Sequence, residues 1–239
     1  MTAGNAAVRG IIFDKDGTLF DFATTWEAWA AGFLLRVSDG DRRVAGTLGA
    51  AIGFDFETQK FRPDSIVIAG TAGDVASGLH PLLPQFDLTE LLYVLNDEAE
   101  RAPQAEAVPL YPFLSGLRAR GLALGLATND AEAPARAHLD AAGVTGQFDF
   151  VAGFDSGHGG KPAPGQLLAF CAATGLDPQE VVMVGDSRHD LSAGRAAGMR
   201  TVGVLTGIAT VDDLAPLAQV VFPDIGHIPD WLDLHRPQS

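Results

Sequence analysis

The chain has 239 residues, of which 47% are hydrophobic and 19% charged, and this composition is typical of a folded globular protein rather than a disordered one. Its 30 acidic residues outnumber its 16 basic ones, and the net charge of −14 argues against a surface that binds nucleic acid or an anionic membrane. One cysteine excludes an intramolecular disulfide, and the chain lacks a signal-type N-terminus and a long apolar stretch, so we expect a cytoplasmic protein.

The first predicted element is a short buried strand that two acidic residues follow directly. Residues 11–13 are apolar and suit a strand that is covered on both faces. Asp14 and Asp16 come next, and Gly17 lets the chain turn sharply. Ligands bind at the carboxyl edge of open parallel sheets, but Asp and Gly are also common in ordinary turns. Taken alone, the pair fits either a site or an acidic turn.

A block of predicted helices follows. Aromatic and apolar residues recur at helical spacing from Trp26 to Val37, and Thr24 with Glu27 has the form of a capping box. Such an aromatic stripe is more typical of a core than of a cofactor site. Further helices are expected over residues 42–52, 65–79 and 88–102.

A linker between Pro103 and Pro109 separates this block from a region where strands and helices alternate. Strands are predicted at residues 122–127, 150–152, 181–184 and 201–204, and helices at 131–142 and 165–174. This alternation predicts an α/β fold with a doubly wound, Rossmann-like parallel sheet. The isolated first strand should join that sheet. We therefore expect a core domain of residues 1–20 and 105–239 and an inserted all-helical cap domain of residues 21–104.

Polar side chains come just after several of these strands. Thr128 and Asn129 follow the second predicted strand, and Asp186 and Asp190 follow a later one. Lys161 stands in a glycine-rich loop ahead of a helix. Each could singly be a helix cap or a solvated charge. Because parallel strands end at one edge of the sheet, their joint placement with the two acids of the first strand indicates a single site.

These motifs resemble those of the haloacid dehalogenase superfamily, in the order in which that family has them. The four matching segments are Asp14-Lys15-Asp16-Gly17-Thr18, Leu126-Ala127-Thr128-Asn129, Lys161-Pro162-Ala163-Pro164, and Gly185-Asp186 with Asp190 four residues after Asp186. The resemblance is to phosphatases of the superfamily that carry a helical, C1-type cap. Asp16 favours phosphoryl transfer, because the dehalogenase branch of the family lacks this second acid.

The resemblance implies a catalytic role for each motif. Asp14 is expected to attack phosphorus and become an aspartyl phosphate, and Asp16 to protonate the leaving alcohol and later activate water. Lys161 and Thr128 are expected to take part in catalysis by binding the phosphoryl group, together with Asn129.

The resemblance also implies Mg²⁺ as the cofactor. Clustered carboxylates repel one another by about 4 kcal/mol per pair at contact distance and an effective dielectric constant near 20, so the site needs cations. Hard oxygen ligands suit Mg²⁺, and the family assigns it to the Asp14 side chain, the Asp16 backbone carbonyl and Asp186. Two roles remain possible for Asp190: it could lie beside the metal, or it could orient Lys161.

The expected function is hydrolysis of a small phosphorylated metabolite by a monomer or homodimer, with phosphoglycolate as the leading substrate. The alternatives are a sugar phosphomutase of the same fold, similar to β-phosphoglucomutase, and a non-catalytic phosphometabolite-binding protein. Substrate choice should reside in the cap, which closes over the site. The cap side chains that could contact the substrate are Trp26, Arg36, Arg42, Arg43, Lys60, Arg62 and His80.

Overall fold

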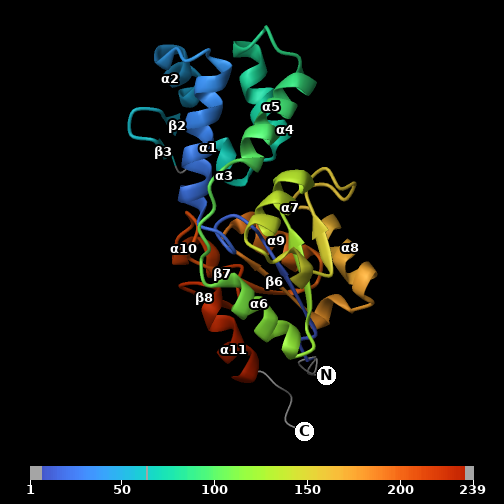
Figure 1. The fold of residues 1–239 in the computed structure, drawn as a ribbon. Coiled ribbons are helices and arrows are strands. Elements are labelled where there is room, and N and C mark those ends of the chain that lie inside the picture. The colour runs from blue at the N-terminus through green and yellow to red at the C-terminus, as the bar shows by residue number, and fades with distance from the viewer. Residues whose placement is uncertain (1–6, 63, 235–239) are drawn as a thin grey trace.

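The computed structural model describes residues 7–62 and 64–234, and it has two parts that are stacked one above the other (Figure 1). The larger part is a parallel sheet with helices on both faces, and the smaller is mainly helical. No helix in the described ranges is long and apolar enough to cross a membrane. The expected α/β fold with an inserted helical region is therefore confirmed.

The sheet has six strands in the order β5-β4-β1-β6-β7-β8, all paired in parallel. Their bounds are β1 (Gly10–Phe13), β4 (Ala123–Ala127), β5 (Phe150–Ala152), β6 (Val181–Gly185), β7 (Arg200–Val204) and β8 (Val220–Phe222). Strand β1 lies between β4 and β6, so the N-terminal strand does join the later sheet. Phe13 pairs with Leu126 on one side and with Val184 on the other, which brings the ends of all three strands to one level.

Helices cover both faces of the sheet because alternate strand residues point to opposite sides. Ile11 and Phe13 pack into one apolar core, and Ile12 packs with Met183 into the other. The first core includes side chains of α6 (Leu110–Ala119), α7 (Glu132–Ala141) and α11 (Ile228–Leu234), and the second those of α8 (Gly165–Thr174) and α9 (Arg188–Ala196). Helix α10 (Val211–Leu214) lies between β7 and β8 in the chain, and single 3-10 turns lie at Thr145–Gln147, Pro178–Glu180 and Ile225–His227.

The inserted part, called the cap below, has an apolar core of its own. Its helices are α1 (Phe22–Val37), α2 (Arg42–Ala51), α3 (Ile66–Ala69), α4 (Ala72–Leu79) and α5 (Leu88–Glu100), with a 3-10 turn at His80–Leu82. The cap also holds a pair of two-residue antiparallel strands, β2 (Phe54–Asp55) and β3 (Lys60–Phe61), which the sequence did not predict.

Two local predictions in the cap were wrong. Helix α1 begins after Asp21, whose side chain accepts a 2.7 Å hydrogen bond from the Thr24 backbone N–H, so the expected capping box that starts at Thr24 does not form. The single helix predicted over residues 65–79 is interrupted at Gly70, which has an extended backbone. Thr71 then starts α4 with a capping box, in which its hydroxyl accepts a hydrogen bond from the Asp74 N–H and the Asp74 carboxylate accepts one from the Thr71 N–H.

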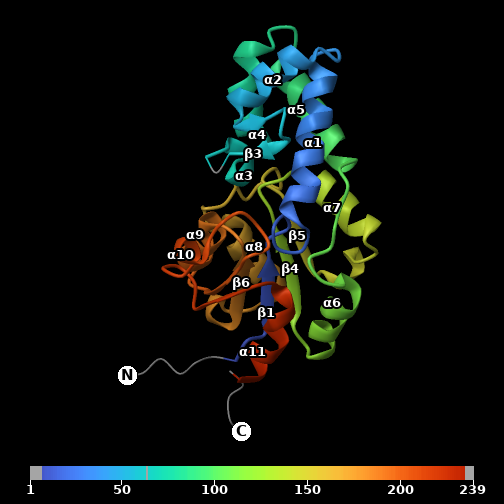
Figure 2. The same ribbon diagram turned by 90° about the vertical axis from the view of Figure 1, so that its left-hand side faces the viewer.

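The two chain segments that connect core and cap lie side by side. The Asp21 N–H donates to the Ala105 carbonyl at 2.8 Å, and the Ala107 N–H donates to the Leu19 carbonyl at 2.9 Å. Helix α5 of the cap also packs against α7 of the core, and both views show the cap above the end of the sheet (Figures 1 and 2). The carboxyl ends of the central strands therefore face the cap.

Candidate active site

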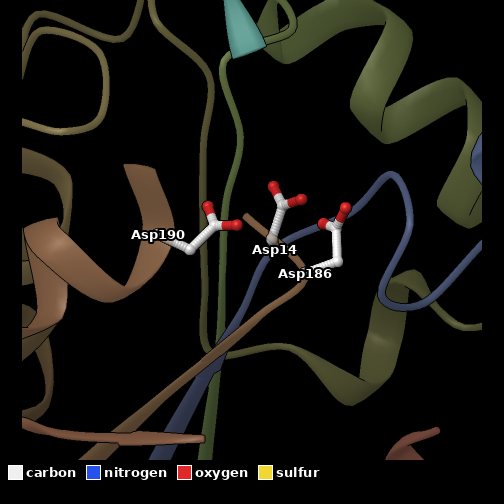
Figure 3. A group of neighbouring side chains, drawn as sticks. All are labelled: Asp14, Asp186 and Asp190. Carbon is white, nitrogen blue, oxygen red and sulfur yellow. The ribbon is translucent and has the colours of Figure 1, made fainter. Parts of the chain in front are cut away.

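A pocket lies between the carboxyl edge of the sheet and the cap, and its lining comes from both parts. The core contributes all the residues that the sequence predicted for the site. They are Asp14, Asp16, Thr128, Asn129, Lys161, Asp186 and Asp190. Figure 3 shows the carboxylates of Asp14, Asp186 and Asp190 gathered at the ends of β1 and β6. The structure thus brings together side chains that are up to 176 positions apart in the chain.

Lys161 is a buried cation between two of these carboxylates. Its Nζ lies 2.5 Å from Asp14 Oδ1 and 2.6 Å from Asp190 Oδ1, and it donates to the Ala127 carbonyl at 2.8 Å. These three partners use all three protons of the ammonium group. Burial lowers the pKa of Lys161, but the two carboxylates outweigh burial and hold that pKa above its ordinary value. Lys161 therefore stays charged and fixes one oxygen of Asp14.

The carboxylates carry more negative charge than Lys161 balances. Burial raises the pKa of Asp14 to about 7, with Asp190 and Asp16 adding to the rise and Lys161 opposing it. Burial, and then Asp190 and Asp14, likewise raise the pKa of Asp186 well above its ordinary value. A divalent cation would relieve this repulsion.

The geometry of the cluster fits such a cation. Carboxylate oxygens of Asp14, Asp186 and Asp190 lie within 4.8 Å of one another, and hard oxygen donors are the ligands that Mg²⁺ prefers. Two glycines keep this space open. A Cβ atom on Gly17 would lie 2.5 Å from Asp186 Oδ2, and one on Gly207 only 1.7 Å from the same atom. Neither distance is sterically possible without moving Asp186.

Asp190 differs from the other two acids because both of its oxygens already have partners. Oδ1 pairs with Lys161, and Oδ2 accepts hydrogen bonds from the Ser187 N–H at 2.9 Å and the Ser187 hydroxyl at 2.7 Å. These two hydrogen bonds with Ser187 belong to the capping box at the N-terminus of α9, a helix of the core. Of the two roles that the sequence left open for Asp190, these contacts favour the orientation of Lys161.

Asp16 is held by a network that the sequence analysis missed. Lys15 is completely buried, and its Nζ donates to Asp16 Oδ1 at 2.7 Å and lies 3.3 Å from Asp130 Oδ2. It also lies 2.9 Å from His138 Nδ1, while His138 Nε2 lies 2.7 Å from the Ala99 carbonyl at the end of α5. A carbonyl can only accept, so Nε2 carries the imidazole proton and Nδ1 accepts from Lys15.

The charge states of this network follow from burial. Burial lowers the pKa of His138 to about 4, with the Lys15 ammonium adding to the effect, so the imidazole is neutral at pH 7. Burial raises the pKa of Asp130 to about 6 against the pull of Lys15. The one sequence signal for the network was a lysine between two acids. Nothing local showed that this lysine is buried.

Thr128 and Asn129 surround Lys161 from the end of β4. The Thr128 hydroxyl accepts a 3.0 Å bond from the Asp130 N–H, which leaves its own O–H proton available to a ligand. The Asn129 side chain instead holds the backbone of Lys161. Its Nδ2 donates to the Lys161 carbonyl at 2.9 Å, and its Oδ1 accepts from the Lys161 N–H at 2.8 Å. The Asn129 side chain therefore holds the loop that carries Lys161 in place.

The cap side of the pocket agrees with the expectation in part. Of the cap side chains named as possible substrate contacts, Trp26 lines the pocket, beside Trp29 and Phe22. The described residues that line the pocket include neither His80 nor any of the five arginine and lysine residues of the cap that were named from the sequence. Four of the five have other contacts. Arg36 pairs with Asp97 and Glu98, Arg42 lies over the Phe56 ring, Lys60 pairs with Glu27, and Arg62 pairs with Asp64.

Comparison with known proteins shows the family of this chain. Residues 8–198 match the family model of the haloacid dehalogenase-like hydrolases. A phosphoglycolate phosphatase of Shigella boydii serotype 4 is 31% identical over 210 residues, which are 84% of this chain and 82% of the relative. The chain therefore belongs to the haloacid dehalogenase-like hydrolases, as its motifs indicated, and it is a phosphatase-type member of that family.

Solved structures share the fold at lower identity. One described as a predicted phosphoglycolate phosphatase from Haemophilus somnus 129pt has a TM-score of 0.71 at 19% identity, covering 95% of this chain and 99% of its own. A β-phosphoglucomutase from Clostridium difficile has a TM-score of 0.62 at 17% identity, covering 95% and 98%. Phosphatases and a mutase thus share this architecture, and the fold alone does not separate the two activities.

Proposed function

We propose that the protein is a cytoplasmic, Mg²⁺-dependent phosphatase that hydrolyses a small phosphomonoester through an aspartyl phosphate on Asp14. The observation that supports this most is the placement of the Asp14 carboxylate. One of its oxygens is fixed by Lys161, and the group lies beside Asp186 at the end of β1 and lines the pocket. An oriented, partly neutralised carboxylate of this kind is suited to nucleophilic attack on phosphorus.

Mg²⁺, held by Asp14, the backbone carbonyl of Asp16 and Asp186, would supply positive charge to the phosphoryl oxygens and to the nucleophile. Lys161 would contribute a second positive charge at the same place, and the Thr128 hydroxyl a hydrogen bond. Asn129 is the third residue that we assign to phosphate binding. These groups act mainly by electrostatic stabilisation, which is the main task in phosphoryl transfer.

Asp16 is the acid and base in this scheme. Its Oδ1 is bound to Lys15, and its side chain lines the pocket two residues from the nucleophile. In the first half-reaction it would give its proton to the leaving alcohol oxygen as the P–O bond breaks. In the second it would take a proton from the water that attacks the phosphorus of the aspartyl phosphate, which releases phosphate and restores Asp14.

Phosphoglycolate is the first substrate to test, because the 31% identical relative bears the name of a phosphoglycolate phosphatase. The assay measures phosphate release from a panel of small-acid, sugar and nucleoside monophosphates, with Mg²⁺ and with a chelator. We expect turnover that the chelator abolishes. No release from any monoester would contradict the proposal, and isomer formation from a hexose 1-phosphate with catalytic bisphosphate would indicate a mutase instead.

A further inference from the structure

The cap wall of the pocket is apolar and partly aromatic. Its lining side chains from α1, α3, α4 and α5 include Phe22, Trp26, Val67, Ile68, Val75 and Leu95. The leaving group of a phosphomonoester must lie on this side, because the phosphoryl group occupies the opposite side with Asp14 and Lys161. This wall therefore selects the alcohol part of the substrate.

The N-terminus of α4, which also reaches the pocket, carries a carboxylate of its own in a capping box. Asp74 Oδ2 accepts from the Thr71 N–H at 2.7 Å and from the Thr71 hydroxyl at 2.8 Å. The positive end of this helix is thus compensated by an acidic side chain of the chain itself. This carboxylate adds negative charge beside residues 70–72, which line the pocket, and therefore disfavours a second anion there.

Cations in the described lining come from the core alone. Lys161 has all three protons engaged, and His189 on α9 is the other lining residue with a basic nitrogen. The lining also includes the carboxylates of Asp14, Asp16 and Asp186, which repel an anionic group. A carboxylate on the leaving group would lie between these acids and the apolar wall, without a cationic partner from the cap, and burial of an unpaired charge is strongly unfavourable.

Asn96 on α5 has a polar side chain that can bind a polar group of the substrate. This side chain lines the pocket and makes no hydrogen bond to a described residue. Its amide can both donate and accept, which suits a hydroxyl, ether or carbonyl group rather than a carboxylate.

We propose, on the basis of the phosphatase function above, that the preferred substrate is the phosphomonoester of an uncharged alcohol with an apolar or aromatic body. The apolar body packs against Trp26 and its neighbours in the wall, and a neutral polar group bonds to Asn96. This class excludes phosphoglycolate as the preferred substrate, although relatives bear that name.

The test compares kcat/KM for matched substrates that differ in one charge. Benzyl phosphate is paired with 4-carboxybenzyl phosphate, and ethyl phosphate with phosphoglycolate, all with Mg²⁺. We expect the uncharged member of each pair to be hydrolysed with about tenfold or higher kcat/KM. Equal or higher kcat/KM for the charged members would overturn the inference while leaving the phosphatase function intact. Absence of turnover of all four would contradict both.

A second experiment introduces a positive charge into the wall. Asn96→Lys should narrow or invert the ratio in favour of the carboxylated substrates, and Asn96→Met, which has a similar length and no charge, should not. A ratio that stays the same in Asn96→Lys, with its helical circular dichroism unchanged, would show that the leaving group does not lie against this wall. That result would overturn the inference even if the uncharged substrates were preferred.

Discussion

The ammonium group of Lys15 lies 2.7 Å from Oδ1 of Asp16, in a side chain with no exposed surface. The same ammonium is bound to His138, and through that imidazole to the Ala99 carbonyl of the cap. A buried, fully bonded cation fixes the carboxyl group that it contacts. Because Ala99 belongs to the cap, the position of Asp16 depends on contacts from both parts of the molecule.

Replacement of Lys15 should impair proton transfer by Asp16. In Lys15→Met we expect the rate of phosphoenzyme formation in single-turnover experiments to fall by about tenfold to a hundredfold for an alkyl phosphate. It should fall much less for p-nitrophenyl phosphate, because p-nitrophenolate leaves readily without a proton. Equal losses for both substrates would show that Lys15 acts only on the fold.

The same variant needs a stability control, because it leaves Asp16 and Asp130 without their cation. Removing one partner of a buried ion pair costs about 3–5 kcal/mol, so the free energy of unfolding should drop by that order. Kinetics are therefore compared at a temperature where both proteins are folded. Lys15→Gln, which keeps N–H donors, should recover part of the leaving-group-dependent loss.

His138 predicts how stability depends on pH. Its pKa is about 4 in the folded protein and near 6.5 in the unfolded chain, so between these values the unfolded state binds a proton that the folded state does not. The free energy of unfolding is therefore highest, as far as His138 is concerned, above pH 6.5, and it decreases as the pH falls toward 4. Between pH 7 and pH 5 this decrease amounts to about 2 kcal/mol.

The measurement is urea unfolding of the wild type and His138→Gln at both pH values. Gln keeps a donor for the Ala99 carbonyl but does not titrate in this range. We expect the free energy of unfolding to decrease by about 2 kcal/mol less in the variant than in the wild type on going from pH 7 to pH 5. An identical loss in the two proteins would mean that His138 is protonated in the folded state.

Gly207 should be intolerant of any side chain. The Cβ atom of Gly207→Ala would lie 1.7 Å from Asp186 Oδ2, so the Asp186 carboxylate must move from its present position. We expect the Mg²⁺ concentration for half-maximal activity to rise by about tenfold or more, with the fold retained. Gly146→Ala is the matched control, because nothing lies within 4 Å of its added Cβ. Normal Mg²⁺ dependence in Gly207→Ala would argue against Asp186 as a ligand.

Asp186 and Asp190 should respond differently to the same change. Asp186→Asn removes a proposed ligand, so its half-saturating Mg²⁺ concentration should rise by about tenfold or more. Asp190→Asn removes a carboxylate that is bound to Lys161, so kcat should fall by about a hundredfold while the half-saturating Mg²⁺ concentration stays the same. A large rise in that concentration for Asp190→Asn would instead place Asp190 on the metal.

Much of the fold and site was predictable because the residues involved follow general rules of parallel sheets. The apolar runs before Asp14 and Asp186 predicted buried strands, and parallel strands that share a sheet end at one edge. That rule predicted that Asp14, Thr128 and Asp186 lie together, and the resemblance to the family's motifs added Lys161.

The features that were missed depend on contacts between distant residues. The burial of Lys15 was not predicted, because lysines are seldom fully buried and its partner His138 is 123 residues away in the chain. Gly207 carried no motif, and its role comes from proximity to Asp186. The stripe that contains Trp26 showed helical spacing, but spacing cannot tell a side chain that lines a pocket from one that fills a core.

The central claim is that Asp14 becomes phosphorylated during turnover, and acid quench during hydrolysis tests it most directly. Wild-type protein is mixed with Mg²⁺ and a turned-over monoester, quenched, reduced with borohydride and digested, and the peptide that contains Asp14 is examined by mass spectrometry. We expect homoserine at position 14, formed by reduction of the acyl phosphate, and neither this product nor phosphate release in Asp14→Asn. Phosphate release by the wild type with no modification at Asp14, or turnover by Asp14→Asn, would contradict the account.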